Sequence, residues 1–153
     1  MFDKHFGILL PIFSLPSKYG IGTFGREAYK FVDFLHSAGQ SCWQILPMGH
    51  TSYGDSPYSS FSVFAGNPYF IDLEVLAEEG FIKEADLEAI DFNNNDGFID
   101  YEELFETRYA VLKKAYANKE KASELNSFAG QNKWVMDYAL FMALKYRNNK
   151  KRA

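Results

Sequence analysis

Cysteine is almost missing from the sequence, because Cys42 is the single one. An internal disulfide is therefore excluded, and the apolar neighbours of Cys42 predict a small buried side chain rather than a reactive thiol. Long hydrophobic runs are missing as well. The apolar run 6–10 ends at Pro11 and is too short for the core of a signal peptide and far too short to span a bilayer. These absences predict a cytoplasmic protein with no membrane partner.

An excess of positive charge is also missing. The 16 Lys and Arg residues are outnumbered by 20 Asp and Glu residues, which gives a net charge of −4. A protein that grips a phosphate backbone needs a basic surface, so nucleic acid is excluded as a partner. What the sequence has in abundance is aromatic residues, with 15 Phe, 10 Tyr and 2 Trp in 153 positions.

The composition changes near Asp72. All the prolines and most of the glycines lie in residues 1–72, whereas most charged residues lie in residues 73–153. Since 153 residues suffice for one ordinary core, the chain is expected to fold as one globular unit. We expect two parts within it, an α/β part over 1–72 and a mostly helical part over 73–153.

The hydrophobic pattern of residues 1–72 predicts a strand, a helix and a second strand. A short apolar run covers 8–10, apolar residues recur at helical spacing over 28–38, and a buried strand is expected over 42–46. Thr23 is the expected cap of the helix and Gly39 its expected end. Such a spacing is typical of a βαβ unit with parallel strands, whose ligands gather at the carboxyl ends of the strands. Both strands lead into long connections, 11–24 and 47–68, which indicates function.

The second part predicts helices. Asp72 is a plausible cap and Gly80 a plausible stop for a helix over 73–79. Two longer helices are expected, one over 101–117 and one around 134–142. Their apolar stripes are interpreted as core.

The strongest local signal is the segment SYGDSPYSSFSVFAGNPYFIDL, which begins at Ser52. Aromatic rings stand here among small and hydroxyl residues just after a predicted strand. A sugar ring has an apolar face that stacks on such rings, and hydroxyls that need nearby donors and acceptors. The run 54–57 is equally typical of a plain turn whose aromatic neighbours only pack around it. The side chains in question are Tyr53, Asp55, Ser56, Tyr58, Phe61, Phe64 and Asn67.

A competing motif is IDFNNNDGFIDYEEL, residues 90–104, which resembles part of an EF-hand calcium loop. Its register fails. With Gly97 at the sixth place, Phe92 falls where an acid must bind; with Asp91 at the first place, Gly97 comes one residue late. We therefore expect neither a metal site nor a cofactor.

The sequence as a whole resembles the 4-α-glucanotransferases, also called amylomaltases or disproportionating enzymes, of glycoside hydrolase family 77. The resemblance rests on GILLPIFSLPSKYGIGTFGREAYKFVDFL, on GQSCWQILPMGHTSYGDSPYSSFSVFAGNPYFIDLEVLAEEG and, more loosely, on IDYEELFETRYAVLKKAY and WVMDYALFMALK. It reaches from the start of the chain to about Tyr146. A motif as long as LP-x-G-x-T-x-YGDSPY-x-SFS-x-FAGNP is far more specific than a short pattern.

The resemblance implies a (β/α)8 barrel enzyme that transfers α-1,4-glucan segments between acceptors by a retaining mechanism. Its partners would be maltooligosaccharides, starch or glycogen. A closed barrel of this kind takes about 250 residues, so this chain is expected to be a partial barrel, its first βαβ unit followed by an inserted helical subdomain. The family's catalytic carboxylates come from later strands, which implies no catalytic residue here. Among the acids of the first part, Asp33 lies on a helix flank, Asp72 reads as a cap and Asp55 stands alone.

Position by position, the resemblance implies sugar contacts in the loop. Ser56 and Tyr58 correspond to donor-side contacts, and Asp55 shapes their turn. Tyr53 resembles an aromatic residue of a second, non-catalytic glucan site, in which Phe105 stands where relatives can have a tyrosine. His50 follows Gly49 where relatives tend to have proline, and we expect it at the surface.

An alternative from another class is a stand-alone glucan-binding or interaction module without catalysis, since the same aromatic loop would serve it.

Overall fold

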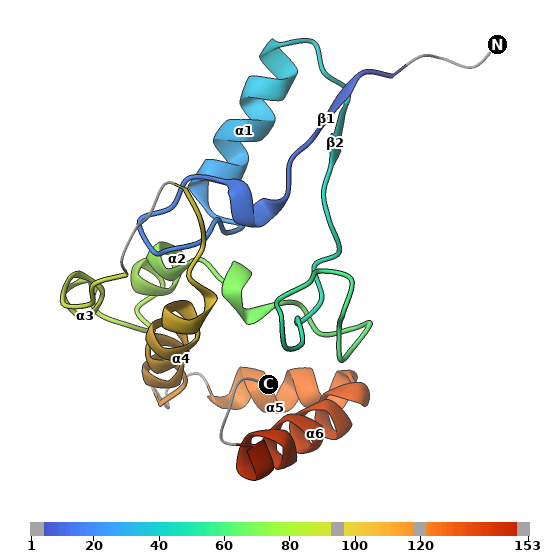
Figure 1. The fold of residues 1–153 in the computed structure, drawn as a ribbon. Helices are drawn as coiled ribbons and strands as arrows, with labels where there is room; N and C mark the ends of the chain where they lie inside the picture. Colours follow the sequence, from blue (N-terminus) through green and yellow to red (C-terminus); the bar gives the residue numbers. More distant parts are fainter. Residues whose placement is uncertain (1–4, 93–96, 118–121, 150–153) are drawn as a thin grey trace.

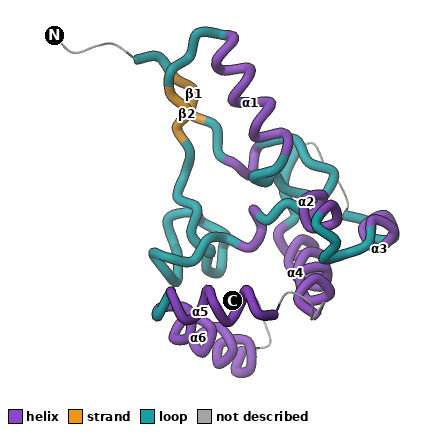
Figure 2. The backbone as a smooth tube through the Cα atoms, turned by 180° about the vertical axis from the view of Figure 1, so that it is seen from behind, coloured by secondary structure: helices purple, strands orange, loops and turns teal. Residues whose placement is uncertain are grey.

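The computed structural model describes residues 5–92, 97–117 and 122–149. Two strands and α1 form an arm at one end, and α5 and α6 lie at the other end (Figure 1). The loop that follows β2 lies between the strands and α5/α6, which the view from behind also shows (Figure 2). The elements, in chain order, are β1 Gly7–Leu9, η1 Ile12–Ser14, α1 Arg26–Ser37, β2 Cys42–Gln44, η2 Pro68–Phe70, α2 Leu73–Glu78, α3 Glu84–Glu88, α4 Tyr101–Ala117, α5 Ala122–Gln131 and α6 Trp134–Asn149.

The two strands pair in parallel, as the sequence predicted. Gly7 lies opposite Cys42, and Leu9 lies opposite Gln44. The prediction that β2 is buried was wrong, because its burial pattern is exposed, half-buried, exposed, and Cys42 is an exposed free thiol. Parallel strands become buried only when both faces of the sheet are covered. Here α1 covers one side, where the ring of Trp43 meets Phe31 at a centroid distance of 4.9 Å.

Helix α1 begins later than the sequence predicted. Its N-cap is Gly25, and Thr23 does not cap it; the Thr23 hydroxyl instead donates to Oδ2 of Asp72. A Cβ on Gly25 would lie 1.7 Å from the same oxygen, so only glycine lets the two segments approach this closely. The predicted end of the helix is confirmed, since Gly39 has φ +69° just beyond the last turn.

Three small groups of buried side chains hold the fold together. The largest joins α2, α3 and α4; it contains Leu73, Ile82, Leu87, Phe92, Val111 and Ala115. A second, under α1, contains Ile12, Leu15 and Ala28. The third joins the first long loop to α4 through Ile21, Tyr69 and Leu104. The stripe predicted on helix 101–117 is therefore core.

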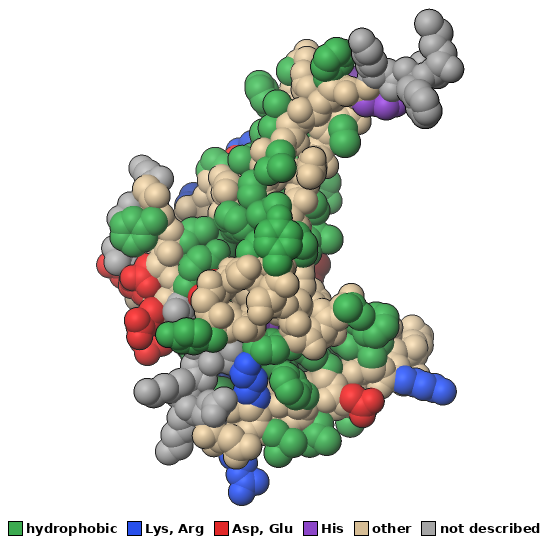
Figure 3. Space-filling view, turned by 45° about the vertical axis from the view of Figure 1, so that its right-hand side comes forward, with side chains coloured by type: hydrophobic (Ala, Val, Ile, Leu, Met, Phe, Trp, Pro, Cys, Tyr) green, Lys and Arg blue, Asp and Glu red, His purple; other side chains and the backbone are tan. Residues whose placement is uncertain are grey.

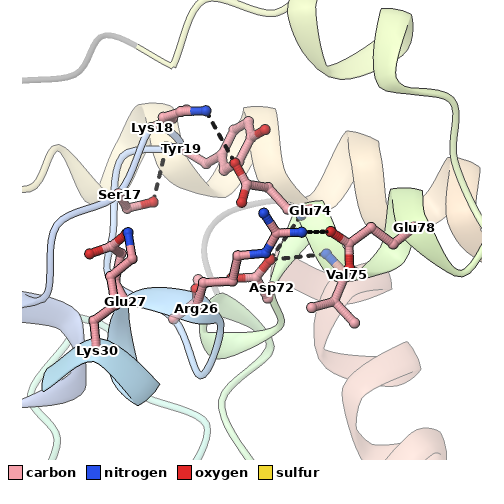
Figure 4. A network of polar contacts seen from close by, with 11 residues as sticks. Ser17, Lys18, Tyr19, Arg26, Glu27, Lys30, Asp72, Glu74, Val75 and Glu78 are labelled. Atoms are coloured by element: carbon pink, nitrogen blue, oxygen red, sulfur yellow. Dashed lines mark hydrogen bonds and ion pairs between the residues drawn. The ribbon is translucent and has the colours of Figure 1, made fainter. Parts of the chain in front are cut away.

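The predicted cap and stop of the next helix are also confirmed. Asp72 accepts hydrogen bonds from the backbone N–H groups of Glu74 and Val75 at the start of α2, and Gly80 follows the helix with φ +78°. The close view in Figure 4 shows Asp72 among the ion pairs that connect this region to the first loop and α1. Lys18 pairs with Glu74, and Arg26 pairs with Glu78.

Large hydrophobic side chains remain at the surface of the arm (Figure 3). They include Phe6, Leu9, Val32 and Phe34. Further exposed hydrophobic side chains lie on α5 and α6, such as Phe128, Met136 and Leu140. Among the helices of the described ranges, none combines the length and the hydropathy that a bilayer crossing requires.

Candidate functional site

The connection after β2 forms a braced loop, residues 49–68, which we call the aromatic loop. Its two sides run antiparallel, with bridges between Gly49 and Gly66 and between Thr51 and Ser60. Backbone hydrogen bonds join Asn67 N–H to Met48 C=O at 2.8 Å and Ser52 N–H to Ser59 C=O at 2.9 Å. The base of the loop is thus fixed by the same kind of contacts that hold a hairpin.

The tip of the aromatic loop is a tight turn. Gly54 and Asp55 both have positive φ, +90° and +53°, and the Asp55 N–H donates to the Ser52 C=O at 3.0 Å. Oγ of Ser56 accepts from the Tyr58 N–H at 3.4 Å. A short polar side chain such as aspartate tolerates this backbone region better than most residues do. Part of the plain-turn interpretation is therefore right.

The aromatic side chains of the loop divide into two kinds. Phe61 and Phe64 pack on α6: Phe61 meets Phe141 at 5.7 Å between centroids, and Phe64 stacks on Trp134 at 5.7 Å and 24°. Tyr53 and Tyr58 at the tip are 81% and 75% exposed. Packing thus accounts for the two phenylalanines but not for the two tyrosines, which stay available to a ligand.

The structure brings all four predicted sugar contacts into one turn. Tyr53, Ser56 and Tyr58 are exposed, whereas Asp55 is half-buried. Asp55 lies near α4. The pKa of Tyr101 on that helix is raised mainly by burial and, second, by the negative charge of Asp55. The turn therefore offers two exposed phenol rings and a hydroxyl, and its carboxylate lies near enough to Tyr101 of α4 to affect it. Their role in sugar binding stays a prediction.

Phe105, the predicted neighbour of a second glucan site, lies half-buried on α4. Its ring packs on that of Tyr109 with centroids 4.8 Å apart. Tyr109 itself reaches the base of the aromatic loop, so Phe105 belongs to the helix surface that supports the loop.

The first long connection also forms a concave surface. A pocket of about 590 Å³ is lined by residues of this connection and by Tyr101 of α4; from the connection come Phe13, Ser14, Leu15, Pro16, Ser17, Gly20, Ile21 and Gly22, and from the segment before α4 come Gly97, Phe98 and Ile99. Tyr101 therefore lies close to both connections, because it borders this pocket and the charge of Asp55 contributes to its raised pKa. The two connections singled out for their length thus approach α4 at neighbouring positions.

His50 was expected at the surface, and that expectation was wrong. Its side chain is only 5% exposed, its Nδ1 pairs with the hydroxyl of Tyr138, and its Nε2 lies 3.1 Å from the hydroxyl of Tyr109. Burial and the nearby Lys145 both lower the pKa of His50. The imidazole fills the space between the aromatic loop, α4 and α6, which sequence spacing alone does not reveal.

Two carboxylates outside the loop tip cap helices. Asp72 uses Oδ1 to cap α2 and Oδ2 to accept from Thr23, and Asp100 caps α4 through the N–H groups of Glu102 and Glu103. Asp33 is exposed on α1. Within the described ranges, no group of three His, Cys, Asp or Glu side chains is placed to hold a metal ion. Residues 93–96 of the EF-hand-like run lie outside the described residues.

Sequence reasoning missed Arg108. This guanidinium is fully buried and donates to the backbone carbonyls of Tyr19 and Ile71, so it joins both long connections to α4. The sequence did contain a signal for its burial, because Arg108 lies between Leu104 and Val111 on the apolar stripe of the helix. A charged residue there is either paired or hydrogen-bonded in the fold.

Comparisons with known proteins agree on one family. The sequence profile described as 4-alpha-glucanotransferase matches residues 10–153. The 4-alpha-glucanotransferase of Clostridium butyricum is 55% identical over 141 residues, which cover 90% of this chain and 29% of that protein. That of Thermus thermophilus is 51% identical over 149 residues, 93% of this chain and 29% of that protein.

A solved structure gives the same result. An amylomaltase from Streptococcus agalactiae in complex with acarbose superposes with a TM-score of 0.90 at 48% identity; the match covers 97% of this chain and 31% of that one. The chain thus spans only 29% to 31% of the length of these relatives.

Proposed function

The chain belongs to the 4-alpha-glucanotransferase family, and from this premise we propose that it contributes a glucan-binding loop to an enzyme that transfers α-1,4-glucan segments between acceptor glucans or glucose. The observation that carries the proposal is the pair of exposed tyrosines, Tyr53 and Tyr58. They lie on a turn whose base is fixed by backbone hydrogen bonds between the two sides of the loop. An exposed ring on a rigid support can stack on a pyranose with little loss of conformational entropy.

In this proposal the loop tip binds and orients the glucan. Tyr58 stacks on a sugar ring, and Ser56 donates or accepts a hydrogen bond at a sugar hydroxyl, as donor-side contacts. Asp55 shapes the turn, while Tyr53 serves a second glucan contact to which Phe105 also belongs. The acarbose bound to the Streptococcus agalactiae amylomaltase is an α-glucan-like ligand, which supports this class of ligand.

The proposal also includes the position of this chain in the larger fold. We infer that β1, α1 and β2 are the first unit of a (β/α)8 barrel, and that residues 73–153 form an inserted helical subdomain. The exposed faces of the two strands support this, because parallel strands are normally covered on both sides. The two long connections follow β1 and β2, at the strand ends where such barrels carry their ligand sites.

The chemistry itself is assigned to residues outside this chain. A retaining transfer needs two carboxylates about 5–5.5 Å apart, one as nucleophile and one as acid and base. In this chain Asp72 and Asp100 cap helices, and Glu74 and Glu78 pair with Lys18 and Arg26. Asp55 is the one carboxylate in the turn 53–58 that carries the exposed tyrosines, which supports a binding role for this loop rather than a catalytic one.

A chimera tests the proposal. The 153-residue chain would replace the matching 29% of the Clostridium butyricum enzyme, to which it is 55% identical. We expect the chimera to disproportionate maltotriose and the isolated chain to leave it unchanged. An inactive but folded chimera would contradict the proposed function, and turnover by the isolated chain would overturn the assignment of the catalytic groups. Glucan binding without any active chimera would favour the stand-alone binding module.

A further inference from the structure

His50 makes contacts to three separate parts of the molecule. Its own backbone belongs to the aromatic loop, where its N–H donates to the Ala65 C=O and its C=O accepts from the Phe61 N–H, both at 3.3 Å. Its two ring nitrogens face Tyr109 of α4 and Tyr138 of α6. One side chain therefore connects the base of the loop to both supporting helices.

The donors and acceptors around this ring determine which of its nitrogens carries the proton. A neutral imidazole has one N–H donor and one bare nitrogen, so one phenol must donate to it and the other must accept from it. Tyr109 is the more deeply buried of the two, and the imidazole is the partner of its hydroxyl in the structure. A buried hydroxyl proton needs an acceptor, whereas the less buried Tyr138 can turn its proton toward water.

We propose that His50 is a positioning residue for the aromatic loop: neutral, with its proton on Nδ1, it donates to Tyr138 and accepts from Tyr109, and so holds the base of the loop against α4 and α6. These two hydrogen bonds fix the base of the loop whether or not a sugar is bound. The consequence for glucan affinity rests on the proposed function.

Protonation would break this arrangement. A second ring proton on Nε2 would turn this nitrogen from an acceptor into a donor, so the buried hydroxyl proton of Tyr109 would lose the imidazole as its acceptor. The titratable and charged groups that face His50 are Tyr109 from α4 and Tyr138 and Lys145 from α6, while Asp55 of the loop acts on Tyr109. Burial and Lys145 both lower the pKa of His50, which keeps the neutral form in place at neutral pH.

Nitrogen NMR of the histidine rings tests the protonation directly. The ¹⁵N-labelled chain holds three histidines, and the variants H5Q and H36Q assign the two outside the loop. We expect His50 to show a protonated Nδ1 and a bare Nε2 at pH 7.5. A protonated Nε2, or rapid exchange between both forms, would overturn the proposal.

Hydrogen exchange tests the positioning role. Y109F and Y138F each remove one hydroxyl, and Y116F on α4 and Y146F on α6 are matched controls with exposed rings. We expect the Phe61 and Asn67 amides to exchange about tenfold faster in Y109F and in Y138F, since a lost buried hydrogen bond contributes roughly that factor. The controls should stay within about twofold of the unchanged chain. Unchanged exchange in either buried variant contradicts the role.

Glucan titration of the chimera, with each variant placed in it, separates this inference from the proposed function. If the loop binds glucan, maltoheptaose should bind about tenfold more weakly to Y109F and Y138F than to the two controls, and more weakly below the pKa of His50 than at pH 7.5. Equal affinity in all four variants would overturn the inference. No binding by the chimera that carries the unchanged chain would overturn the proposed function instead, while the NMR and exchange results would still decide the role of His50.

Discussion

Lys145 of α6 lies over the ring of Phe61 in the aromatic loop, with its Nζ 3.5 Å from the ring centroid. A cation at this position is attracted by the ring face and adds about 0.5–1 kcal/mol at an exposed site. The same ammonium group also acts on the neighbouring imidazole, because Lys145 follows burial as the second cause that lowers the pKa of His50. This end of α6 therefore affects both the packing and the charge state of the loop base.

Removal of that charge should raise the pKa of His50. In K145Q the imidazolium form no longer faces a positive neighbour, so protonation becomes easier and the pKa moves up toward the ordinary value of 6.5. Titration of the ring nitrogens by NMR measures the shift. K113Q is the matched control, since Lys113 lies over the ring of Tyr146, and it should leave the titration of His50 in place. A lower pKa in K145Q would contradict the assigned geometry.

Stability should fall as the pH drops through 6.5. Because the folded-state pKa of His50 lies below its unfolded value, the unfolded chain binds more protons in the window between the two. The contribution of His50 is fully present above pH 6.5, is lost progressively down to the folded pKa, and changes no further below it. Urea unfolding at pH 7.5 and 5.5 should show a smaller pH effect in H50F than in the unchanged chain. Equal pH effects would refute this linkage.

Replacement of Arg108 should destabilise the fold strongly. Burial lowers its pKa to about 10, so it stays charged at neutral pH, and R108M would leave the carbonyls of Tyr19 and Ile71 without their donor. We expect a loss of about 2–3 kcal/mol in urea unfolding, because each orphaned buried group costs 1–3 kcal/mol and the removal of the unpaired Nε offsets part of it. The exposed R147M should change stability by less than about 0.5 kcal/mol. Similar effects for both variants would show that Arg108 is not a structural link.

Gly25 should not tolerate a side chain. In G25A the new Cβ would lie 1.7 Å from Oδ2 of Asp72, which must then leave Thr23 or shift the cap of α2. Overpacking of this kind costs about 1–3 kcal/mol. G66A is the control, because a Cβ there meets nothing within 4 Å and we expect a change below about 1 kcal/mol. Thermal unfolding compares the two, and a neutral G25A would contradict the close approach.

Local sequence signals predicted most of the secondary structure. The apolar spacing of helix 101–117 gives the bounds of α4 as Tyr101–Ala117, and Asp72 caps α2 as its position before an apolar run indicates. The parallel pairing of the two strands follows from a helix between two short apolar runs. These features depend on neighbours in the sequence, which is why they could be predicted.

Features that depend on distant contacts could not be predicted in this way. Thr23 is a good cap by type, but its hydroxyl bonds to Asp72, 49 residues away. Cys42 has apolar neighbours yet is exposed, since burial depends on what covers the sheet. His50 was expected at the surface and Arg108 was not singled out, yet both are buried among groups from other elements. The loop motif indicated the candidate site, whereas its support from α4 and α6 needed the structure.

Glucan affinity of tyrosine variants is the measurement that tests the central claim most directly. Tyr29 on α1 is 74% exposed, almost as much as Tyr58 at 75%, so Y29A controls for the loss of an exposed ring away from the loop. Calorimetric titration of the chimera with maltoheptaose should show about tenfold weaker binding for Y58A and for Y53A, since a stacked aromatic contributes roughly 0.5–1.5 kcal/mol beyond its buried area. Y29A should bind as the unchanged chimera does. Undiminished affinity in Y58A and Y53A, with both variants folded, would contradict the proposal that the aromatic loop holds the glucan.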